Sequence, residues 1–193
     1  MPDSPTSKPT GYDEFIGIFA KYKKLSTLSL GTAAAVPFVA YLSGIAPPWP
    51  PGVVLITSLV ELLALIVVFQ FLRSAPRRVA NRVIVVAMSF LLLSSVCYLV
   101  LFAFFTYPIR ATQARGIKGF VCQHGLLTSF LEACPFLQIE HLKEVGYDAE
   151  VLWQSWSIDL MSLLIVLTWM AAFIFLSILV GAFIVFQGRV RAR

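Results

Sequence analysis

Three long apolar runs dominate this sequence and decide which solvent the chain can fold in. They extend from Val53 to Leu72, from Val83 to Phe105 and from Leu160 to Phe186. A bilayer core of about 30 Å takes roughly 20 apolar residues in a helix, and each of the three runs is that long. A weaker run from Leu28 to Ile45 just reaches the lower limit, and its Pro37 should kink a helix. We therefore predict an all-α integral membrane protein with four transmembrane helices.

The composition also favours lipid rather than water as the main solvent. Hydrophobic residues make up 59% of the chain and charged residues only 13%, whereas soluble domains carry about 25% charged residues. A soluble fold of this size would have to expose much of that apolar surface. The predicted organisation is a cytosolic tail with an interfacial helix (1–27), transmembrane helices one to three (28–105), an extracytoplasmic loop or cap (106–159), and the fourth transmembrane helix with a basic tail (160–193).

Arginine and lysine are unevenly distributed around the apolar runs, and this predicts the orientation. Three short basic segments contain Lys8, Lys21, Lys23 and Lys24, then Arg73, Arg77, Arg78 and Arg82, and finally Arg189, Arg191 and Arg193. Short basic segments remain on the cytoplasmic side of a membrane. The connection 46–52 has no charge, and the loop 106–159 is acidic on balance. We therefore expect a multi-pass protein with both termini in the cytoplasm and these two connections outside.

The segment before the weaker run, which begins at Leu28, has the pattern of a helix that lies in the membrane interface. Thr10 and Asp13 fit a capping box, and Tyr12, Phe15 and Phe19 recur at helical spacing. The lysines that follow would contact anionic lipid headgroups. In one interpretation the basic residues only set the topology. The other interpretation is a cytosolic surface for an anionic ligand or a partner, formed by Lys21, Lys23, Lys24, Arg73, Arg77, Arg78 and Arg82.

The loop 106–159 is long enough to fold into a small cap, because loops of this length are rarely structureless. Its apolar spacing predicts short helices over residues 125–134 and 138–145. A third helix, capped by Asp148, is expected to run through Trp153 into the last span.

Two cysteines of this loop, Cys122 and Cys134, are candidates for a disulfide. Paired cysteines outside the cytoplasm most often form one. The alternative is a metal site that also uses His124 and His141, although this spacing matches no common zinc pattern. Cys97, inside the run from Val83 to Phe105, is expected to be a small apolar core residue.

Glu61 is the only ionisable residue well inside any of the four runs. A charge near the bilayer centre costs about 2.5–3.5 kcal/mol on insertion scales, so this carboxyl group must be neutral, paired or hydrated. In one interpretation Glu61 is protonated and holds helices together through a hydroxyl group, with Thr57, Ser58, Ser94, Ser95 and Tyr98 as candidate partners. In the other interpretation, Glu61, Gln70 and Ser58 line a pore or a proton path.

The chain lacks the common signatures of catalysis and of nucleotide binding. There is no phosphate-binding loop of the Walker type, no GxGxxG, no HExxH and no nucleophile elbow. The spans also lack an obvious internal repeat, which weakens a secondary-transporter interpretation. We therefore expect no enzyme activity, no cofactor and no metal.

The layout of four spans with a compact outer loop resembles the membrane subunits of bacterial anti-phage defence operons of the Hailong and Kiwa types. The stretches Gly119 to Cys122, Tyr147-Asp148, and Leu152-Trp153 to Ser157-Ile158 also look like a pattern in bacterial membrane proteins. This resemblance implies a homo-oligomer, possibly a tetramer, in the bacterial inner membrane that permeabilises the membrane or relays an envelope signal. In the Hailong-type case it implies a pore held shut by a cytosolic DNA-like oligonucleotide.

The leading functional prediction is an oligomeric channel that acts as a defence effector and is gated from the cytosol by a ligand or an operon partner. The first alternative is a non-conducting sensor or scaffold that recruits a cytosolic partner. Further alternatives are an immunity or accessory protein for a membrane toxin and a small transporter.

Overall fold

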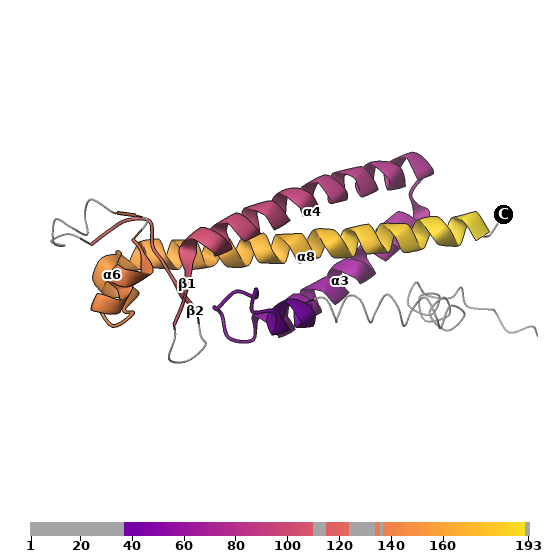
Figure 1. The fold of residues 1–193 in the computed structure, drawn as a ribbon. Coiled ribbons are helices and arrows are strands. Elements are labelled where there is room, and N and C mark those ends of the chain that lie inside the picture. The colour runs from indigo at the N-terminus through magenta and orange to yellow at the C-terminus, as the bar shows by residue number, and fades with distance from the viewer. Residues whose placement is uncertain (1–36, 110–114, 124–133, 136, 192–193) are drawn as a thin grey trace, which may run out of the picture.

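Three long helices form the body of the molecule (Figure 1). The computed structural model describes residues 37–109, 115–123, 134–135 and 137–191. The helices are α3 (Val53–Ser74), α4 (Arg77–Phe105) and α8 (Ser155–Arg191). All three are long and apolar enough to cross a membrane, so three of the four predicted spans are confirmed as candidate membrane helices.

The central element is α8, which packs against α4 on one side and against α3 on the other. Thr57 in α3 contacts Trp169 in α8, and Gly181, farther along α8, lies against Val68, farther along α3. These two helices therefore run in the same direction. The chain reverses at the short link between α3 and α4, so α4 runs in the opposite direction.

The helices bury narrow stripes and expose wide apolar faces. The packed core gathers the side chains Tyr98, Phe102, Ile165, Trp169 and Phe173 from α4 and α8. A second cluster joins α3 and α8 near their other end, through Phe69, Leu72, Ala182 and Val185. Most of the α4 surface is exposed and apolar. A large apolar surface of this kind suits lipid or neighbouring protein rather than water.

The helices extend beyond the apolar runs that predicted them. The second of them, α4, begins at Arg77 and not at Val83, and α8 spans Ser155–Arg191 and not Leu160 to Phe186. The predicted bounds were too narrow because hydropathy marks the part of a helix that suits lipid. Basic and polar residues continue the helix into the interface, where they are well solvated. The bend at Pro76, which cannot continue α3, sets the start of α4.

The first predicted span lies largely outside the described residues. Residues 37–42 are helical, and the chain turns at residues 43–44 into the proline-rich connection that precedes α3. The kink was expected at Pro37, which is the first described residue of this segment. The predicted interfacial helix and the lysines at 21, 23 and 24 lie outside the described residues. A fourth span and the orientation of the termini therefore remain predictions.

A small cap lies at one end of the helices, and we use this name for the described parts of residues 106–154. It contains a two-stranded antiparallel hairpin, in which β1 (Thr106–Pro108) pairs with β2 (Arg115–Ile117). The all-α prediction was wrong here. Thr106 and Tyr107 directly follow α4, and β-branched and aromatic residues pack well on a pleated ladder. The Tyr107 ring also lies over Gly116, its partner in the register.

Two short helices complete the cap: α6 (Ile139–Glu144) and α7 (Ala149–Leu152). Both were predicted, and Asp148 caps α7 by accepting a hydrogen bond from the backbone N–H of Glu150. The predicted continuation of α7 into the last span is wrong. The chain is extended at Trp153, which forms a backbone bridge to Cys122, and α8 then begins at Ser155. The predicted helix 125–134 is largely outside the described residues.

Candidate functional site

One face of α3 is buried against the rest of the bundle, and Glu61 lies in the middle of it. The buried residues recur at intervals of three or four positions, as Val53, Thr57, Glu61, Leu65, Phe69 and Leu72. This spacing places them on one side of a helix. Glu61 is therefore the single acid in a stripe that faces the core and is otherwise apolar except for Thr57.

A hydrogen bond between α3 and α8 lies one helical turn from Glu61, towards the cap. The indole N–H of Trp169 donates to the Thr57 hydroxyl oxygen at 2.9 Å. The Thr57 hydroxyl in turn donates to the carbonyl oxygen of Val53 at 2.7 Å, and its oxygen lies 3.3 Å from the Met170 sulfur. The Trp169 ring is also in contact with Tyr98 and Phe173, with ring centroids 5.1 and 4.5 Å away. Trp169 therefore connects all three long helices.

The carboxyl group of Glu61 is enclosed, yet it has no hydrogen-bond partner among the described residues. The residue is 1% exposed, and neither carboxyl oxygen is bonded. The hydroxyl of Ser177 in α8 is likewise buried and unbonded within the described part of the chain. Enclosed polar groups are normally paired, and an unpaired one costs about 1–3 kcal/mol. The buried face of α3 and the interior side of α8 thus each contain a polar group that purely structural packing would not need.

Among the described residues, Glu61 does not make the hydrogen bond to a hydroxyl group that the helix-glue interpretation requires. Hydroxyl groups in apolar helices tend to bond a carbonyl of their own preceding turn. The Ser58 hydroxyl donates to Val54 and the Ser94 hydroxyl to Phe90. The Tyr98 hydroxyl donates to the carbonyl oxygen of Ile45. These three hydroxyl protons are therefore donated to backbone carbonyls, and none is donated to the Glu61 carboxyl group.

The three predicted pore-lining residues do not lie on one face of α3. Glu61 is buried, Ser58 is half-buried beside it, and Gln70 is exposed. Gln70 follows Glu61 by roughly two and a half helical turns, which places it on the opposite side of the helix. The structure therefore brings Glu61 and Ser58 together but separates Gln70 from them within one chain.

Four arginines of the predicted anionic-ligand surface are among the described residues. They lie close to the link between α3 and α4. Arg73 is in the last turn of α3, and Arg77, Arg78 and Arg82 are in the first turns of α4. All four are exposed. We call this region the basic end. It lies at the opposite end of the helices from the cap (Figure 1). The lysines that were predicted to extend it lie outside the described residues.

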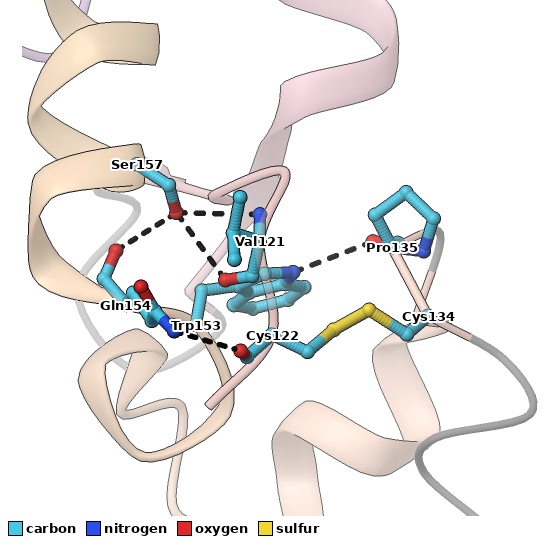
Figure 2. The surroundings of a disulfide bond; sticks show 7 residues. All are labelled: Val121, Cys122, Cys134, Pro135, Trp153, Gln154 and Ser157. Atoms are coloured by element: carbon cyan, nitrogen blue, oxygen red, sulfur yellow. Dashed lines mark hydrogen bonds between the residues drawn. A yellow bond between two sulfur atoms is a disulfide. The ribbon is translucent and has the colours of Figure 1, made fainter. Parts of the chain in front are cut away.

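The predicted disulfide between Cys122 and Cys134 is confirmed (Figure 2). Both sulfur atoms are consumed by the bond, so the alternative metal site with these cysteines as ligands is excluded. Cys97 is a free thiol on the exposed surface of α4, so its predicted place in the core is wrong. The outward face of a membrane helix is apolar too, and hydropathy alone cannot distinguish it from the core.

The disulfide lies in a network that connects the cap to the start of α8, as Figure 2 shows. The backbone N–H of Gln154 donates to the Val121 carbonyl at 2.9 Å. The Trp153 indole N–H donates to the Pro135 carbonyl at 3.4 Å, next to Cys134. The Ser157 hydroxyl, in the first turn of α8, contacts Val121 and donates to the Gln154 carbonyl. A movement of the cap would therefore act directly on α8.

Two titratable groups of the cap have shifted pKa values. Burial raises the pKa of Tyr107 above its ordinary value of 10.0, and the nearby Asp148 carboxylate raises it further. The Tyr107 hydroxyl donates to the carbonyl oxygen of Tyr147 at 3.0 Å. Burial lowers the pKa of Lys118, whose ammonium group donates to the Leu137 carbonyl at 3.0 Å. Both groups hold separate segments of the cap together.

Sequence reasoning did not identify Trp169, Ser177 or Ser157 as site residues. A signal existed for Trp169, because it lies in the middle of an apolar run whereas tryptophan prefers the membrane boundary. Ser177 follows Trp169 by about two helical turns, so it shares the same face of α8. Nothing in the local sequence distinguishes Ser157 from other serines.

Comparison with protein-family models, with curated proteins and with solved structures finds no match to this chain.

Proposed function

We propose that this chain is the subunit of an oligomeric channel in a bacterial inner membrane and acts as an effector of anti-phage defence. The main support is the carboxyl group of Glu61, which is enclosed between helices without a hydrogen-bond partner in the described residues. Ionisable groups inside transmembrane segments are costly and are typical of ion and proton paths. A carboxyl group without a hydrogen-bond partner suits the closed state of a channel. When the channel opens, water would enter and form hydrogen bonds with this group.

The proposed path runs along the interface between α3 and α8. Separation of these helices would expose Glu61 and Thr57 to water, since both are buried polar residues on the face of α3 that packs in the bundle. The Trp169–Thr57 hydrogen bond would hold the path shut on the cap side of Glu61. Gln70 has no place in this path within one subunit, because it faces away.

Gating from the cytosol is proposed to act through the basic end. Arg77, Arg78 and Arg82 are exposed in the first turns of α4, where an anionic ligand can reach them. The resemblance to defence-operon subunits favours an oligonucleotide or a cytosolic operon partner as that ligand, and anionic lipid would occupy the same charges in its absence. The short link at Pro76 would pass a movement of α4 to α3.

Assembly of several copies is proposed because the described helices α3, α4 and α8 are too few to surround a water-filled path on their own. The exposed faces of α3 and α4 offer wide apolar surfaces for contact with other copies. Small side chains allow helices to approach closely in membranes. The resemblance favours a tetramer.

The direct test is conduction in a planar bilayer with purified, reconstituted protein. We expect the wild-type protein to conduct, and Glu61→Gln to change the single-channel conductance or the cation preference at least severalfold. Gln70→Ala is the matched control, since it removes a polar side chain from the opposite face of the same helix. A wild-type protein that inserts but never conducts, with or without its operon partners, would overturn the channel. Unchanged currents in Glu61→Gln would remove this residue from the path.

A second function, a non-conducting sensor that recruits a cytosolic partner, is favoured by a different observation. The cap is hydrogen-bonded to the first turn of α8, and α8 continues without interruption to the other end of the molecule. An event at the cap would therefore be transmitted along one helix. Capture of a soluble operon partner that is lost on combined Arg77→Glu and Arg78→Glu substitution, together with absent conduction, would favour the sensor over the channel.

A further inference from the structure

An apolar hollow opens at the cap end of the helices, and neither the channel nor the sensor proposal uses it. Its volume is about 890 Å³. The walls come from the helical segment at residues 38–42, the proline-rich connection 44–52 and the first residues of α3. Nearly all of these side chains are apolar or are prolines and glycines, so the walls suit a hydrocarbon chain.

Arg115 of β2 completes the lining, and it is the one charged side chain among the described residues there. A nitrogen of its guanidinium group donates to the Thr106 hydroxyl oxygen at 3.3 Å. The guanidinium carbon lies 4.7 Å from the centre of the Phe102 ring, which is a cation–π arrangement. These two contacts fix the guanidinium group of a residue that lines the hollow, and among the described residues they use only part of its five N–H donors.

The hollow lies at the boundary between the membrane helices and the cap. Arg115 pairs with Pro108 in the hairpin that directly follows the last residue of α4. The opposite wall is the connection that directly precedes α3. In a bilayer this is the depth of the lipid headgroups, where apolar and charged surface meet.

We propose that this hollow binds an anionic amphiphile, with its phosphate or carboxylate group on Arg115 and its hydrocarbon chain along the apolar walls. A guanidinium group presents planar donors that match both anions in a bidentate manner. Leu42 and Leu55 of the wall are 68% and 72% exposed, so a hydrocarbon chain would cover surface that the described residues leave open. The site would give the protein a lipid ligand on the cap side, independent of the anion-binding basic end.

The test is binding of phosphatidylglycerol to the full-length protein in an uncharged detergent, followed by native mass spectrometry. We expect phosphatidylglycerol to bind more tightly than phosphatidylcholine, and Arg115→Gln to weaken the binding on the order of tenfold. Arg115→Lys should retain part of the affinity because it keeps the charge and loses the bidentate geometry. Lys143→Gln is the matched control, since Lys143 is an exposed basic residue elsewhere in the cap. Equal binding of both lipids, or full binding by Arg115→Gln, would overturn the proposal.

Two further arms distinguish the source of the anion and the role of the walls. Inorganic phosphate should fail to compete with the lipid at equal concentration, and effective competition would contradict an amphiphile ligand.

Leu42→Ser in the wall should weaken lipid binding severalfold. Leu63→Ser, at a residue that is 63% exposed on α3 but outside the hollow, should not. Equal effects of the two serine substitutions would show that the walls do not hold the chain. Protection of the Gln154 backbone N–H from hydrogen exchange in every variant verifies that the cap has folded.

Discussion

At the scale of single residues, Gly119 is a position where the cap leaves almost no room. A Cβ atom there would lie 2.2 Å from the Ser157 hydroxyl oxygen and 2.7 Å from the Trp153 Cβ atom. We predict that Gly119→Ala destabilises the cap by about 1–3 kcal/mol, the usual cost of overpacking. Hydrogen exchange at the backbone N–H of Gln154, which is bonded to the Val121 carbonyl, measures this directly.

A double substitution provides the control for this prediction. Ser157→Ala removes the nearer of the two obstructing atoms, so it should recover part of the stability lost in Gly119→Ala. The Trp153 contact remains, so recovery should be incomplete. Wild-type protection of the Gln154 amide in the single Gly119→Ala variant would show that the close packing at this glycine is not real.

Tyr107 provides a pH-dependent prediction at the same scale. Its pKa is raised in the folded cap, so the folded state holds this proton more tightly than the unfolded chain does. Its contribution to stability is therefore complete below pH 10 and is lost as the pH rises through the folded pKa. Lys118 acts in the opposite sense, because its lowered pKa makes stability rise with pH in the range just below 10.5.

The two effects are separated by Tyr107→Phe, which leaves Lys118 unchanged. We predict that this variant costs about 1 kcal/mol at neutral pH, because the bond to the Tyr147 carbonyl is lost. Its stability should then fall less steeply than that of the wild type above pH 10. Thermal unfolding of the cap between pH 8 and pH 11 tests this, and parallel curves for both proteins would contradict it.

Some residues of the candidate site could be predicted from the sequence, but their surroundings could not. Glu61 and the two loop cysteines were identifiable, because an acid in an apolar run and a cysteine pair are unusual in any context. The surroundings of Glu61 were not identifiable. Hydroxyls at helical spacing appeared available to it, but Ser58 and Ser94 bond within their own helices. Which hydroxyl is free depends on packing between helices, and that information is not local.

At the scale of elements, the Trp169–Thr57 bond is predicted to hold α3 on α8. Thr57→Val keeps the side-chain volume and leaves the buried indole N–H without an acceptor. We expect a loss of about 1–2 kcal/mol, since hydrogen bonds between membrane helices contribute modestly. Reversible unfolding in mixed detergent micelles measures it.

Thr168→Val is the matched control for Thr57→Val. The Thr168 hydroxyl donates only within its own helix, to the carbonyls of Leu164 and Ile165. This variant should remain within about 0.5 kcal/mol of the wild type, as substitutions outside inter-element contacts usually do. Equal effects at positions 57 and 168 would show that the bond between the helices contributes nothing measurable.

The disulfide is predicted to stabilise the cap without supporting the helices. Its cysteines are 12 residues apart, and closing a loop of that size contributes about 3 kcal/mol in the chain-entropy estimate. Combined Cys122→Ser and Cys134→Ser should increase hydrogen exchange in the cap and leave the middle of α8 protected. Cys97→Ser, at the free cysteine of α4, should change neither. Unchanged exchange in the cap after loss of the disulfide would contradict this role.

Element boundaries were predicted less well than element existence. Apolar length predicted α3, α4 and α8, because lipid demands a fixed run of apolar residues. The start of α4 and both ends of α8 were missed because many residues there are polar but still helix-compatible. The hairpin was missed because strands of three residues carry too little periodicity to be recognised. The break at Trp153 depends on its bridge to Cys122, a contact between distant parts of the sequence.

At the scale of the whole molecule, the chain is a set of apolar helices with a different chemistry at each end. The cap end has a disulfide, a hairpin and the hollow with Arg115, whereas the basic end has Arg77, Arg78 and Arg82. The separation of the two ends was predictable from the charge pattern alone. The central place of α8 between α3 and α4 was not, because no local pattern identifies which helix packs in the middle.

The proposed membrane topology places lipid between the cap and the basic end. Membrane-impermeant maleimide on intact cells tests it, with single cysteines introduced as Glu150→Cys in α7 and Arg77→Cys in α4, both at exposed positions. The background carries Cys97→Ser, and the disulfide protects the other two cysteines. We predict that position 150 reacts on intact cells and that position 77 reacts only after permeabilisation. Labelling of both positions from the same side would contradict the account.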